Sequence, residues 1–477
     1  MKSSDPLLEA WERTLARKRD APAIFATSGK VIRTFNDVEQ RASELVANIG
    51  SYPEGDVLAV QLGNHEDWPS ILLGCLRRRL VVLPLEQSIG DQQRDAALEI
   101  CRARAVMSAP PGGGFANVLP LRAASNTFES APDWGENRPN LLKLTSGTTA
   151  VPRAIRFRSG QLLADCNQIC ETMGITDADL NFGVIPISHS YGFSNLLSPL
   201  LARGVAMVLS RDRTPRAILV DLVRSNATVF PGMPVFYQAF CEMEPVPKLP
   251  KLRLCISAGA PLSSAMATRF QQKFNLPIHS FYGASECGGI CYDREAGDRN
   301  EGFVGEAMKS VTLDMIDPSA SATQIRVRSA AVGDGYFPDP DREKLGGGIF
   351  VPDDLLARDK SGFRIVGRKS DVINVAGKKV NPAEVEAHLL RLTGVRQAVV
   401  FGRESSLRNE EVAACVVAAP EVSELDLLQF CRDALSTWQV PKRIFIVDRI
   451  PANERGKISR RELSRRFSIN RDRSSLP

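Results

Sequence analysis

The chain has 477 residues, more than one hydrophobic core supports, so its length predicts at least two domains. Its apolar content of 43% and charged content of 24% are those of an ordinary globular protein and exclude wholesale disorder. The formal net charge of +5 is small for this length and does not indicate a nucleic-acid-binding protein, which would concentrate positive charge on one face.

Residues 1–140 show both helical and strand patterns. The run LLEAWERTLARKR has apolar residues at helical spacing, whereas DVLAVQL and LVVLPL are Val- and Leu-rich runs typical of buried strands. Between residues 140 and 290, three strand patterns, in NLLKLTS, NFGVIPIS and VAMVLS, are each followed by a helical pattern. This alternation predicts an α/β fold with a largely parallel sheet.

The patterns change twice in the last third of the chain. Residues 300–366 lose the helical spacing and read as strands and turns, and helical and strand patterns alternate again after Arg368. We therefore expect a large N-terminal domain with mostly parallel sheets, residues 1–367, and a small α+β C-terminal domain, residues 368–477. The polar, basic tail after Leu463 is expected to be frayed.

Targeting signals and cysteine spacing point to a reducing compartment. The N-terminus has no apolar leader, and no run approaches the roughly 18 apolar residues of a membrane span. The ten cysteines include two pairs at i,i+4 spacing but neither a CxxC motif nor a Cys/His cluster with zinc spacing. We expect a cytoplasmic protein whose cysteines are small buried side chains.

Residues 144–153, LTSGTTAVPR, form a candidate phosphate loop after an apolar strand. Glycine lets backbone N–H groups approach a polyanion, hydroxyl side chains add donors without bulk, and Arg153 supplies a positive charge. The GxxxxGK[ST] pattern is absent, so this is not a Walker A loop. Taken alone, the segment fits either a phosphate-binding loop or an ordinary turn rich in Ser, Thr and Gly.

This segment resembles the phosphate-binding signature of the adenylate-forming (AMP-binding) superfamily, which includes acyl- and aryl-CoA synthetases. The family pattern is Thr/Ser-Ser-Gly-Thr-Thr-Gly-x-Pro-Lys, with Ala150 here in place of the last glycine and Arg153 in place of the lysine. Arginine keeps the charge but offers a planar fork. The resemblance implies that nucleotide phosphates are bound by Thr145, Ser146, Gly147, Thr148, Thr149 and Arg153.

Two further segments resemble the family's acid and adenine sites. PISHSYGFSN (186–195) is similar to the acid-pocket segment, which implies that His189 and Phe193 line the pocket and that His189 acts on the acid. A lone histidine is as often structural. SAGAPLS (257–263) resembles the loop that packs on adenine, where small residues let the backbone lie flat on a base. The residues implied there are Ala258, Gly259, Ala260 and Pro261.

The segment SFYGASE (280–286) is similar to the family's Asn-x-Tyr-Gly-x-Thr-Glu. The resemblance implies that Tyr282 stacks on adenine, that Gly283 and Ala284 line the nucleotide site, and that the Ser285 hydroxyl reaches the α-phosphate. It also implies that Glu286 holds Mg²⁺, which prefers carboxylate oxygens together with substrate phosphates.

The C-terminal motifs imply a moving domain. Asp354 aligns with the family's ribose-binding carboxylate, with Asp353 as a competing candidate, and Arg368 resembles an arginine that also reaches the nucleotide. Ser370, beside Asp371, aligns with the family's hinge. Two further residues complete the resemblance: Gly377 in NVAGKKV at the thiol entry, and Lys457 in ERGKIS as the closing catalytic lysine.

The resemblance implies that ATP activates a carboxylic acid as its acyl-AMP and that a thiol then takes the acyl group. The implied cofactors are ATP, Mg²⁺, and coenzyme A or carrier-protein pantetheine. The pocket segment lacks the aspartate with which amino-acid-activating relatives bind an ammonium group, so a fatty or aromatic acid is expected. The alternatives are an acyl-carrier-protein ligase, an adenylate-forming enzyme that uses no thiol, and, more remotely, an inactive nucleotide-binding relative.

Overall fold

The computed structural model describes residues 5–108, 117–120, 130–145, 153–297, 300–375, 378–405, 409–451 and 458–468. The chain divides into two compact units, and the smaller one takes in most of the chain after residue 363. Two short segments, 315–325 and 353–358, also belong to the smaller unit, so the chain passes between the units more than once. The predicted boundary at 367/368 stays a prediction.

The first large sheet of unit 1 has a parallel centre and antiparallel edges. Strands β1, β10, β9, β11, β12 and β13 are parallel neighbours in that order, whereas β2, β14 and β15 pair antiparallel at the two edges. The strands are β1 (Pro22–Ala26), β2 (Val31–Thr34), β9 (Leu180–Gly183), β10 (Ala206–Leu209), β11 (Val229–Gly232), β12 (Leu254–Ser257), β13 (Ile278–Ala284), β14 (Gly288–Tyr292) and β15 (Phe303–Ala307).

A second sheet is built mainly from the N-terminal third of the chain. Its order is β18-β8-β7-β4-β3-β5-β6, with parallel pairing from β7 through β5 and antiparallel pairing at the edges. The strands are β3 (Val57–Gln61), β4 (Val81–Pro84), β5 (Ala103–Ser108), β6 (Asn117–Pro120), β7 (Leu141–Leu144), β8 (Ala154–Phe157) and β18 (Gly335–Phe337).

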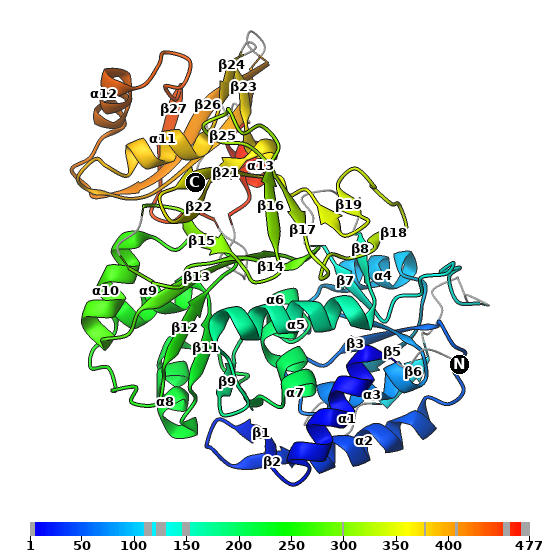
Figure 1. Cartoon of the computed structure of the whole chain (residues 1–477). Coiled ribbons are helices and arrows are strands. Elements are labelled where there is room, and N and C mark those ends of the chain that lie inside the picture. Colours follow the sequence, from blue (N-terminus) through cyan, green and yellow to red (C-terminus); the bar gives the residue numbers. More distant parts are fainter. Residues whose placement is uncertain are drawn as a thin grey trace, which may run out of the picture. The chain divides into compact units, whose positions relative to one another are not determined.

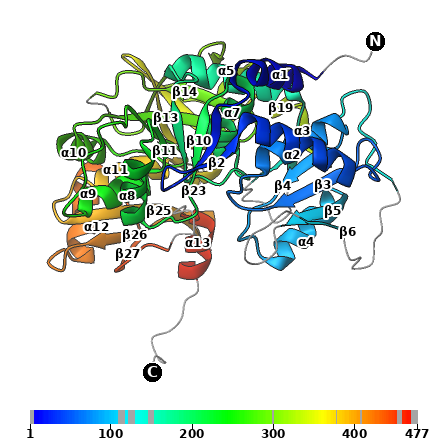
Figure 2. The same ribbon diagram turned by 90° about the horizontal axis from the view of Figure 1, so that it is seen from below.

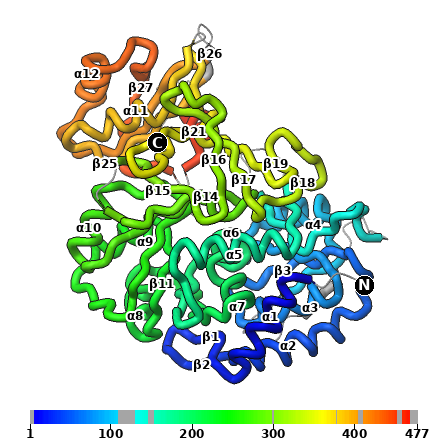
Figure 3. Tube along the Cα trace, in the orientation of Figure 1, coloured from blue at the N-terminus to red at the C-terminus, as the bar shows by residue number. Residues whose placement is uncertain are grey.

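The helices of unit 1 cover both sheets. Helix α5 lies between the two sheets in both views (Figures 1 and 2), which explains why so much of its surface is buried. Helix α1 packs against α5 and α7 (Figure 3). The helical segments are α1 (Pro6–Lys18), α2 (Phe35–Asn48), α3 (Trp68–Arg77), α4 (Asp91–Ile100), α5 (Ser159–Met173), α6 (Ser190–Gly192), the π-helix η1 (Phe193–Leu197), α7 (Ser198–Arg203), α8 (Pro215–Ser225), α9 (Pro234–Glu242) and α10 (Ser264–Phe274).

An aromatic core joins α8, α9 and α10 to the first sheet. Tyr237 and Phe270 meet edge to face with ring centroids 5.1 Å apart, and Phe230 contacts Tyr237 and Phe240. Such rings bury large apolar areas, so this half of the unit is a rigid base for the strand ends that carry the candidate site. A small antiparallel sheet lies nearby in the chain, made of β16 (Thr312–Met315), β17 (Ile325–Arg328), β20 (Ile349–Phe350) and β19 (Leu345–Gly346).

The smaller unit has its own α+β core. Strands β25 and β26 form a long antiparallel pair, with β27 parallel to β26. Helices α11 and α12 contribute Val385, Leu389, Leu427 and Cys431 to the core on one side. The elements are β21 (Asp354–Asp359), β22 (Gly362–Arg368), the 3-10 helix η2 (Lys369–Asp371), β23 (Ile373–Val375), β24 (Lys378–Val380), α11 (Pro382–Leu389), β25 (Val395–Ser405), β26 (Asn409–Ala418), α12 (Glu424–Ala434), β27 (Arg443–Ile446) and α13 (Arg460–Ser468).

The α/β fold class with a small C-terminal domain is confirmed, and one expectation is wrong. Residues 464–477 were expected to fray, but α13 continues to Ser468, so the expectation is wrong for residues 464–468, and the rest of the tail lies outside the described residues. Leu463 is buried, and Phe467, one helical turn later, stacks on Phe445 with ring centroids 4.5 Å apart. The i,i+4 spacing of these two apolar side chains anchors the helix to the sheet despite its basic composition. No helix in the described ranges is long and apolar enough to cross a membrane.

Candidate active site

The candidate phosphate loop joins two neighbouring antiparallel strands. β7 leads into it and β8, which the sequence patterns did not predict, leads out of it. The Thr145 amide donates to the Arg153 carbonyl at 2.8 Å and closes the base of the loop. The predicted phosphate ligands between these two residues, Ser146, Gly147, Thr148 and Thr149, lie outside the described residues.

The YGASE motif occupies the end of β13 and the turn into β14. Tyr282 is buried in β13, and Gly283 passes so close to β14 that an added Cβ would lie 2.7 Å from the Gly288 carbonyl oxygen. Only glycine fits that approach. Ala284, Ser285 and Glu286 are partly exposed, so the polar end of the motif is open to a ligand.

Tyr336 connects the two phosphate-facing motifs. Its hydroxyl donates to Glu286 Oε1 at 3.0 Å, and the Arg153 guanidinium lies 5.7 Å from the centre of its ring. The Gly333 amide also donates to the Glu286 carbonyl at 2.9 Å. These contacts fix the Glu286 side chain and backbone near Arg153. Sequence reasoning did not single out Tyr336. The only sequence feature that could have pointed to it is the short GYF segment, which forms β18.

The predicted acid-pocket segment meets the YGASE motif through two hydroxyl groups. Ser190 Oγ donates to Ser285 Oγ at 3.0 Å. His189 Nδ1 accepts from the Tyr191 amide at 3.2 Å, which caps the short helix α6 and fixes the ring. Phe193 is buried, with its ring facing the Lys143 ammonium 5.4 Å away. The pocket roles of His189 and Phe193 stay predictions.

Asn64 holds the start of the acid-pocket segment in place. Its Nδ2 carries two N–H donors and lies within hydrogen-bond distance of three carbonyl oxygens, those of Gly183 at 2.9 Å and of Ile185 and Ser210 at 3.2 Å. Its Oδ1 accepts from the Ile187 amide at 2.9 Å. A single buried amide therefore fixes the chain that leads to His189, and no sequence pattern pointed to it.

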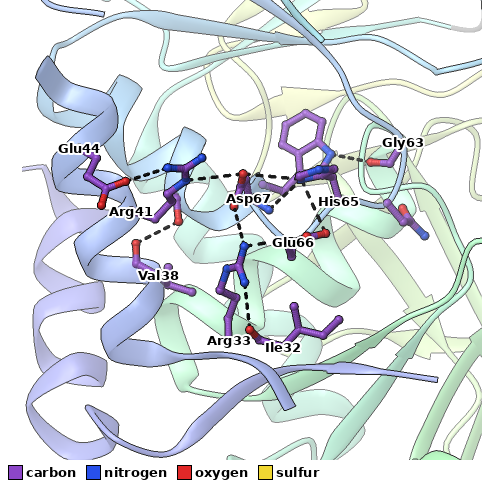
Figure 4. A network of polar contacts seen from close by, with 12 residues as sticks. Ile32, Arg33, Val38, Arg41, Glu44, Gly63, His65, Glu66 and Asp67 are labelled. Carbon is purple, nitrogen blue, oxygen red and sulfur yellow. Dashed lines mark hydrogen bonds and ion pairs between the residues drawn. The ribbon is translucent and has the colours of Figure 1, made fainter. Parts of the chain in front are cut away.

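The loop that carries Asn64 is itself fixed by a polar network (Figure 4). Asp67 lies between Arg33, at 3.6 Å, and Arg41, at 3.7 Å, and its amide donates to His65 Nδ1 at 3.1 Å. The Trp68 indole donates to the Gly63 carbonyl at 2.7 Å. Because Asp67 is almost fully buried, the two guanidinium groups compensate a charge that would otherwise destabilise the loop.

The predicted adenine loop follows β12. Ala258 is buried, whereas Gly259, Ala260 and Pro261 are exposed. Gly259 has a φ of +86°, which a residue with a Cβ rarely adopts. The small, exposed backbone at this strand end is suited to lie against a flat ring, and the adenine role stays a prediction.

In the smaller unit, the two nucleotide candidates contact one another. Arg368 Nε donates to Asp354 Oδ1 at 2.7 Å, whereas Asp353 accepts the Lys369 amide through its backbone carbonyl. Both aspartates are partly exposed, so burial does not separate them as ribose ligands. Ser370 is exposed within η2. The predicted thiol-entry residue Gly377 and the predicted catalytic residue Lys457 lie outside the described residues.

Comparisons with known proteins agree with the motifs and the fold. The family model for the AMP-binding enzyme matches residues 11–337, and the model for its C-terminal domain matches residues 384–457. A probable CoA ligase of Humulus lupulus is 27% identical over 92% of both chains, and an oxalate–CoA ligase of Arabidopsis thaliana is 27% identical over 97% of this chain and 99% of its own.

A solved structure shows the same fold. ATP-bound MatB from Rhodopseudomonas palustris superposes with a TM-score of 0.83 at 24% identity and covers 96% of this chain and 98% of its own. The chain belongs to the AMP-binding enzyme family, and the resemblance of its motifs to adenylate-forming enzymes is confirmed. It is an ATP-dependent, AMP-forming ligase of the acyl- and aryl-CoA synthetase type, which activates a carboxylic acid and joins it to a thiol.

Proposed function

We propose that the acid and the α-phosphate of ATP meet where the acid-pocket segment adjoins the YGASE motif. The observation that carries this proposal is the 3.0 Å contact between the Ser190 and Ser285 hydroxyl groups. A carboxylate oxygen of the acid attacks the α-phosphorus, and the bond to the bridging oxygen of pyrophosphate breaks. The products are acyl-AMP, whose acyl carbon has a good leaving group, and pyrophosphate.

The predicted phosphate ligands would stabilise the charge that develops in this step. The loop from Thr145 to Arg153 holds the β- and γ-phosphates, and the Ser285 hydroxyl donates to the α-phosphate. Preorganised donors of this kind stabilise a phosphoryl-transfer transition state because the enzyme does little covalent chemistry itself. The contacts of Tyr336 with Arg153 and Glu286 support one shared phosphate site.

The residues beside Glu286 fit a magnesium ion. Its carboxylate is oriented by Tyr336, and no group of three or more His, Cys, Asp or Glu side chains gathers in the described part of the chain. Mg²⁺ needs no such group, because it takes one or two carboxylates together with substrate phosphates and water. When bound, the ion would neutralise phosphate charge, and Glu286 would be the protein ligand.

The remaining nucleotide contacts are assigned to motifs in different parts of the chain. Tyr282 and residues 258–261 take the adenine. The Asp354 carboxylate takes both ribose hydroxyl groups, because two acceptor oxygens suit a diol, and Arg368, which donates to Asp354 Oδ1 at 2.7 Å, orients that carboxylate. After pyrophosphate leaves, we propose that the small domain turns about Ser370. Lys457 then leaves the site, and the face that carries Gly377 admits the thiol.

The acid is proposed to be fatty or aromatic, and coenzyme A is the proposed acceptor. Curated relatives include feruloyl-CoA synthases, a benzoate–CoA ligase and long-chain-fatty-acid–CoA ligases, at 25–27% identity. A carrier-protein pantetheine presents the same thiol and is the second candidate. We place the enzyme in the cytoplasm, because all ten of its cysteines are unpaired and thiols persist in reducing compartments.

Pyrophosphate release, measured for a panel of fatty and aromatic acids with and without CoA, tests the proposal. The expected result is acid-dependent release followed by CoA-dependent consumption of acyl-AMP. Acyl-AMP that accumulates and is released whether or not CoA is present would favour an enzyme that uses no thiol. If none of the fatty or aromatic acids in the panel caused pyrophosphate release, the proposed class of acid would be wrong.

The half-reactions separately test Lys457. Loss of one donor to developing charge costs about 10²–10³ in rate, so Lys457→Ala should slow pyrophosphate release by that order. The same variant, supplied with chemically made acyl-AMP, should form thioester at the wild-type rate. Equal losses in both steps, or no loss in either, would overturn the assignment.

A further inference from the structure

A buried carboxylate on α5 contacts the metal-site turn and the acid-pocket helix at once. Asp165 is only 4% exposed. Its Oδ1 accepts from the Gly289 amide at 3.0 Å, and its Oδ2 accepts from Ser194 Oγ at 2.5 Å. Gly289 follows Glu286 by three residues, and Ser194 lies in η1, which continues directly from the acid-pocket segment.

The turn after Glu286 is shaped to fit this carboxylate. Gly288 has a φ of +70°, and a Cβ added there would lie 1.9 Å from Asp165 Oδ1. The Cys287 amide donates to the Ala284 carbonyl at 3.3 Å, so the turn is short and closed. Because only two residues lie between Gly289, which contacts Asp165, and Glu286, a shift of the Asp165 carboxylate would move the Glu286 backbone.

Lys143 is a second buried charged residue, and its positive charge is opposite in sign to that of Asp165. It lies in β7 two residues before the phosphate loop, is 5% exposed, and places Nζ 4.5 Å from the Phe157 ring centre and 5.4 Å from that of Phe193. Among the residues that the structure describes, no hydrogen bond or ion pair reaches this ammonium group. Aromatic faces attract a cation, but they do not replace its lost hydration.

The two buried groups are electrostatically linked. Burial lowers the pKa of the Lys143 ammonium, and the neighbouring Asp165, Cys287 and Glu286 act in the opposite direction, with Asp165 contributing most. A buried charge without a counter-charge destabilises a protein, so each of these two groups lowers the free-energy cost of burying the other. No role in the site has been assigned to either residue above.

We propose that Asp165, with Lys143 as its counter-charge, is a positioning residue that holds the Glu286 turn in register with the acid-pocket helix. The pair thereby sets how tightly the site binds the metal complex of ATP. This role rests on the proposed assignment of Glu286 to Mg²⁺.

Equilibrium binding of Mg·ATP to the full-length protein, measured by calorimetry without acid, tests the role. Asp165→Asn keeps the shape but replaces one acceptor oxygen by an amide donor, so Mg·ATP should bind more weakly. Loss of a residue that orients a metal ligand typically weakens binding about 10-fold to 100-fold. Asp179→Asn is the matched control, since Asp179 is equally buried but bonds Arg253 and Thr228.

The control should lose stability yet bind Mg·ATP within about twofold of wild type. Equal weakening by the two variants, or no weakening by Asp165→Asn, would overturn the proposal. Lys143→Met tests the charge pairing. Removing both charges should cost less unfolding free energy than the sum of the single variants, whereas additive costs would rule out the pair.

Two further measurements separate this inference from the proposed function. Glu286→Gln in the same titration tests the metal assignment. If that variant bound Mg·ATP as tightly as wild type, the assignment of Glu286 to the metal would be wrong, whatever the result for Asp165. Hydrogen exchange of the Gly289 amide tests the position of the turn without any ligand. Faster exchange in Asp165→Asn than in Asp179→Asn is expected, and equal protection would overturn the positioning role whatever Glu286 does.

Discussion

At the scale of single residues, the candidate site depends on side chains that orient others. Tyr336 shows this most clearly, because its ring faces Arg153 and its hydroxyl holds Glu286. A carboxylate that must bind a metal with one geometry loses affinity when its orienting hydrogen bond is removed. If Glu286 holds the metal as proposed, we expect Tyr336 to affect ATP use, although no step of the chemistry is assigned to it.

We predict that Tyr336→Phe raises the Mg²⁺ concentration needed for half-maximal pyrophosphate release by about tenfold, because the Glu286 carboxylate loses its donor. The measurement is a magnesium titration at saturating ATP and acid. Tyr237→Phe is the control, since that hydroxyl bonds only the Phe230 and Ile256 carbonyls in the core. An unchanged magnesium requirement in Tyr336→Phe would show that the contact is incidental.

At the scale of elements, the acid-pocket segment is placed by an amide from another loop. Asn64 contacts the ends of β9 and β10 and the backbone at Ile185 and Ile187. The loop that carries it is held by Asp67, Arg33 and Arg41 (Figure 4). Two chain segments more than a hundred residues apart thus define one wall of the site.

We predict that Asn64→Asp raises KM for the acid at least tenfold and changes KM for ATP little. The substitution keeps the shape but turns a donor toward three carbonyl oxygens into a carboxylate oxygen that repels them. Steady-state kinetics with each substrate varied in turn would check this. A parallel rise of both KM values would indicate general loosening of the unit.

The helices and strands also bury every thiol. All ten cysteines are buried, and burial raises the pKa of Cys75 and of Cys101 to about 12 and that of Cys431 to about 11. Since the thiolate is the reactive form, a pKa of about 11 or 12 leaves about 0.1% thiolate or less at pH 8. We predict negligible labelling of the native protein by a thiol reagent at pH 8 and ten labelled thiols after denaturation. Rapid labelling of one native thiol would reveal local opening at its element.

At the scale of the whole molecule, two compact units share one chain that passes between them several times. Arg460 ties the start of α13 to both Asp371 and Glu386 within the smaller unit, at 2.7 and 2.8 Å. The segment after the proposed hinge and the helix after Lys457 therefore belong to one body, which would move as a whole.

We predict that Ser370→Pro slows thioester formation from acyl-AMP at least tenfold while pyrophosphate release changes less. Proline fixes φ and resists the backbone change that a domain rotation at this position requires. Measuring the two half-reactions separately checks the prediction. A control proline must not remove a helix cap, which excludes Ser423→Pro, because Ser423 caps α12. Ser361→Pro, in the turn between β21 and β22, is a better control. Equal losses in both half-reactions would argue against a hinge at Ser370.

The sequence by itself determined the family, the fold class and the order of the motifs. Strands such as β3 and β4 could be predicted because a fully buried parallel strand is a short, continuous apolar run. Tyr282 and Glu286 could be named because they lie in one contiguous motif. The end of α13 was missed, because its basic composition hides a two-residue apolar contact with β27.

The tertiary structure alone decided which residues support the site. Asn64 lies in the loop between β3 and α3, whereas Asp165, Lys143 and Tyr336 lie in α5, β7 and β18, and none of the four has a local sequence pattern that indicates its role. Their roles depend on contacts between distant residues: Asn64 with Ile187, 123 positions away, Asp165 with Gly289, 124 positions away, and Tyr336 with Glu286, 50 positions away. Propensity and periodicity describe short-range preferences, whereas a buried hydrogen bond between distant segments exists only once the sheets have packed.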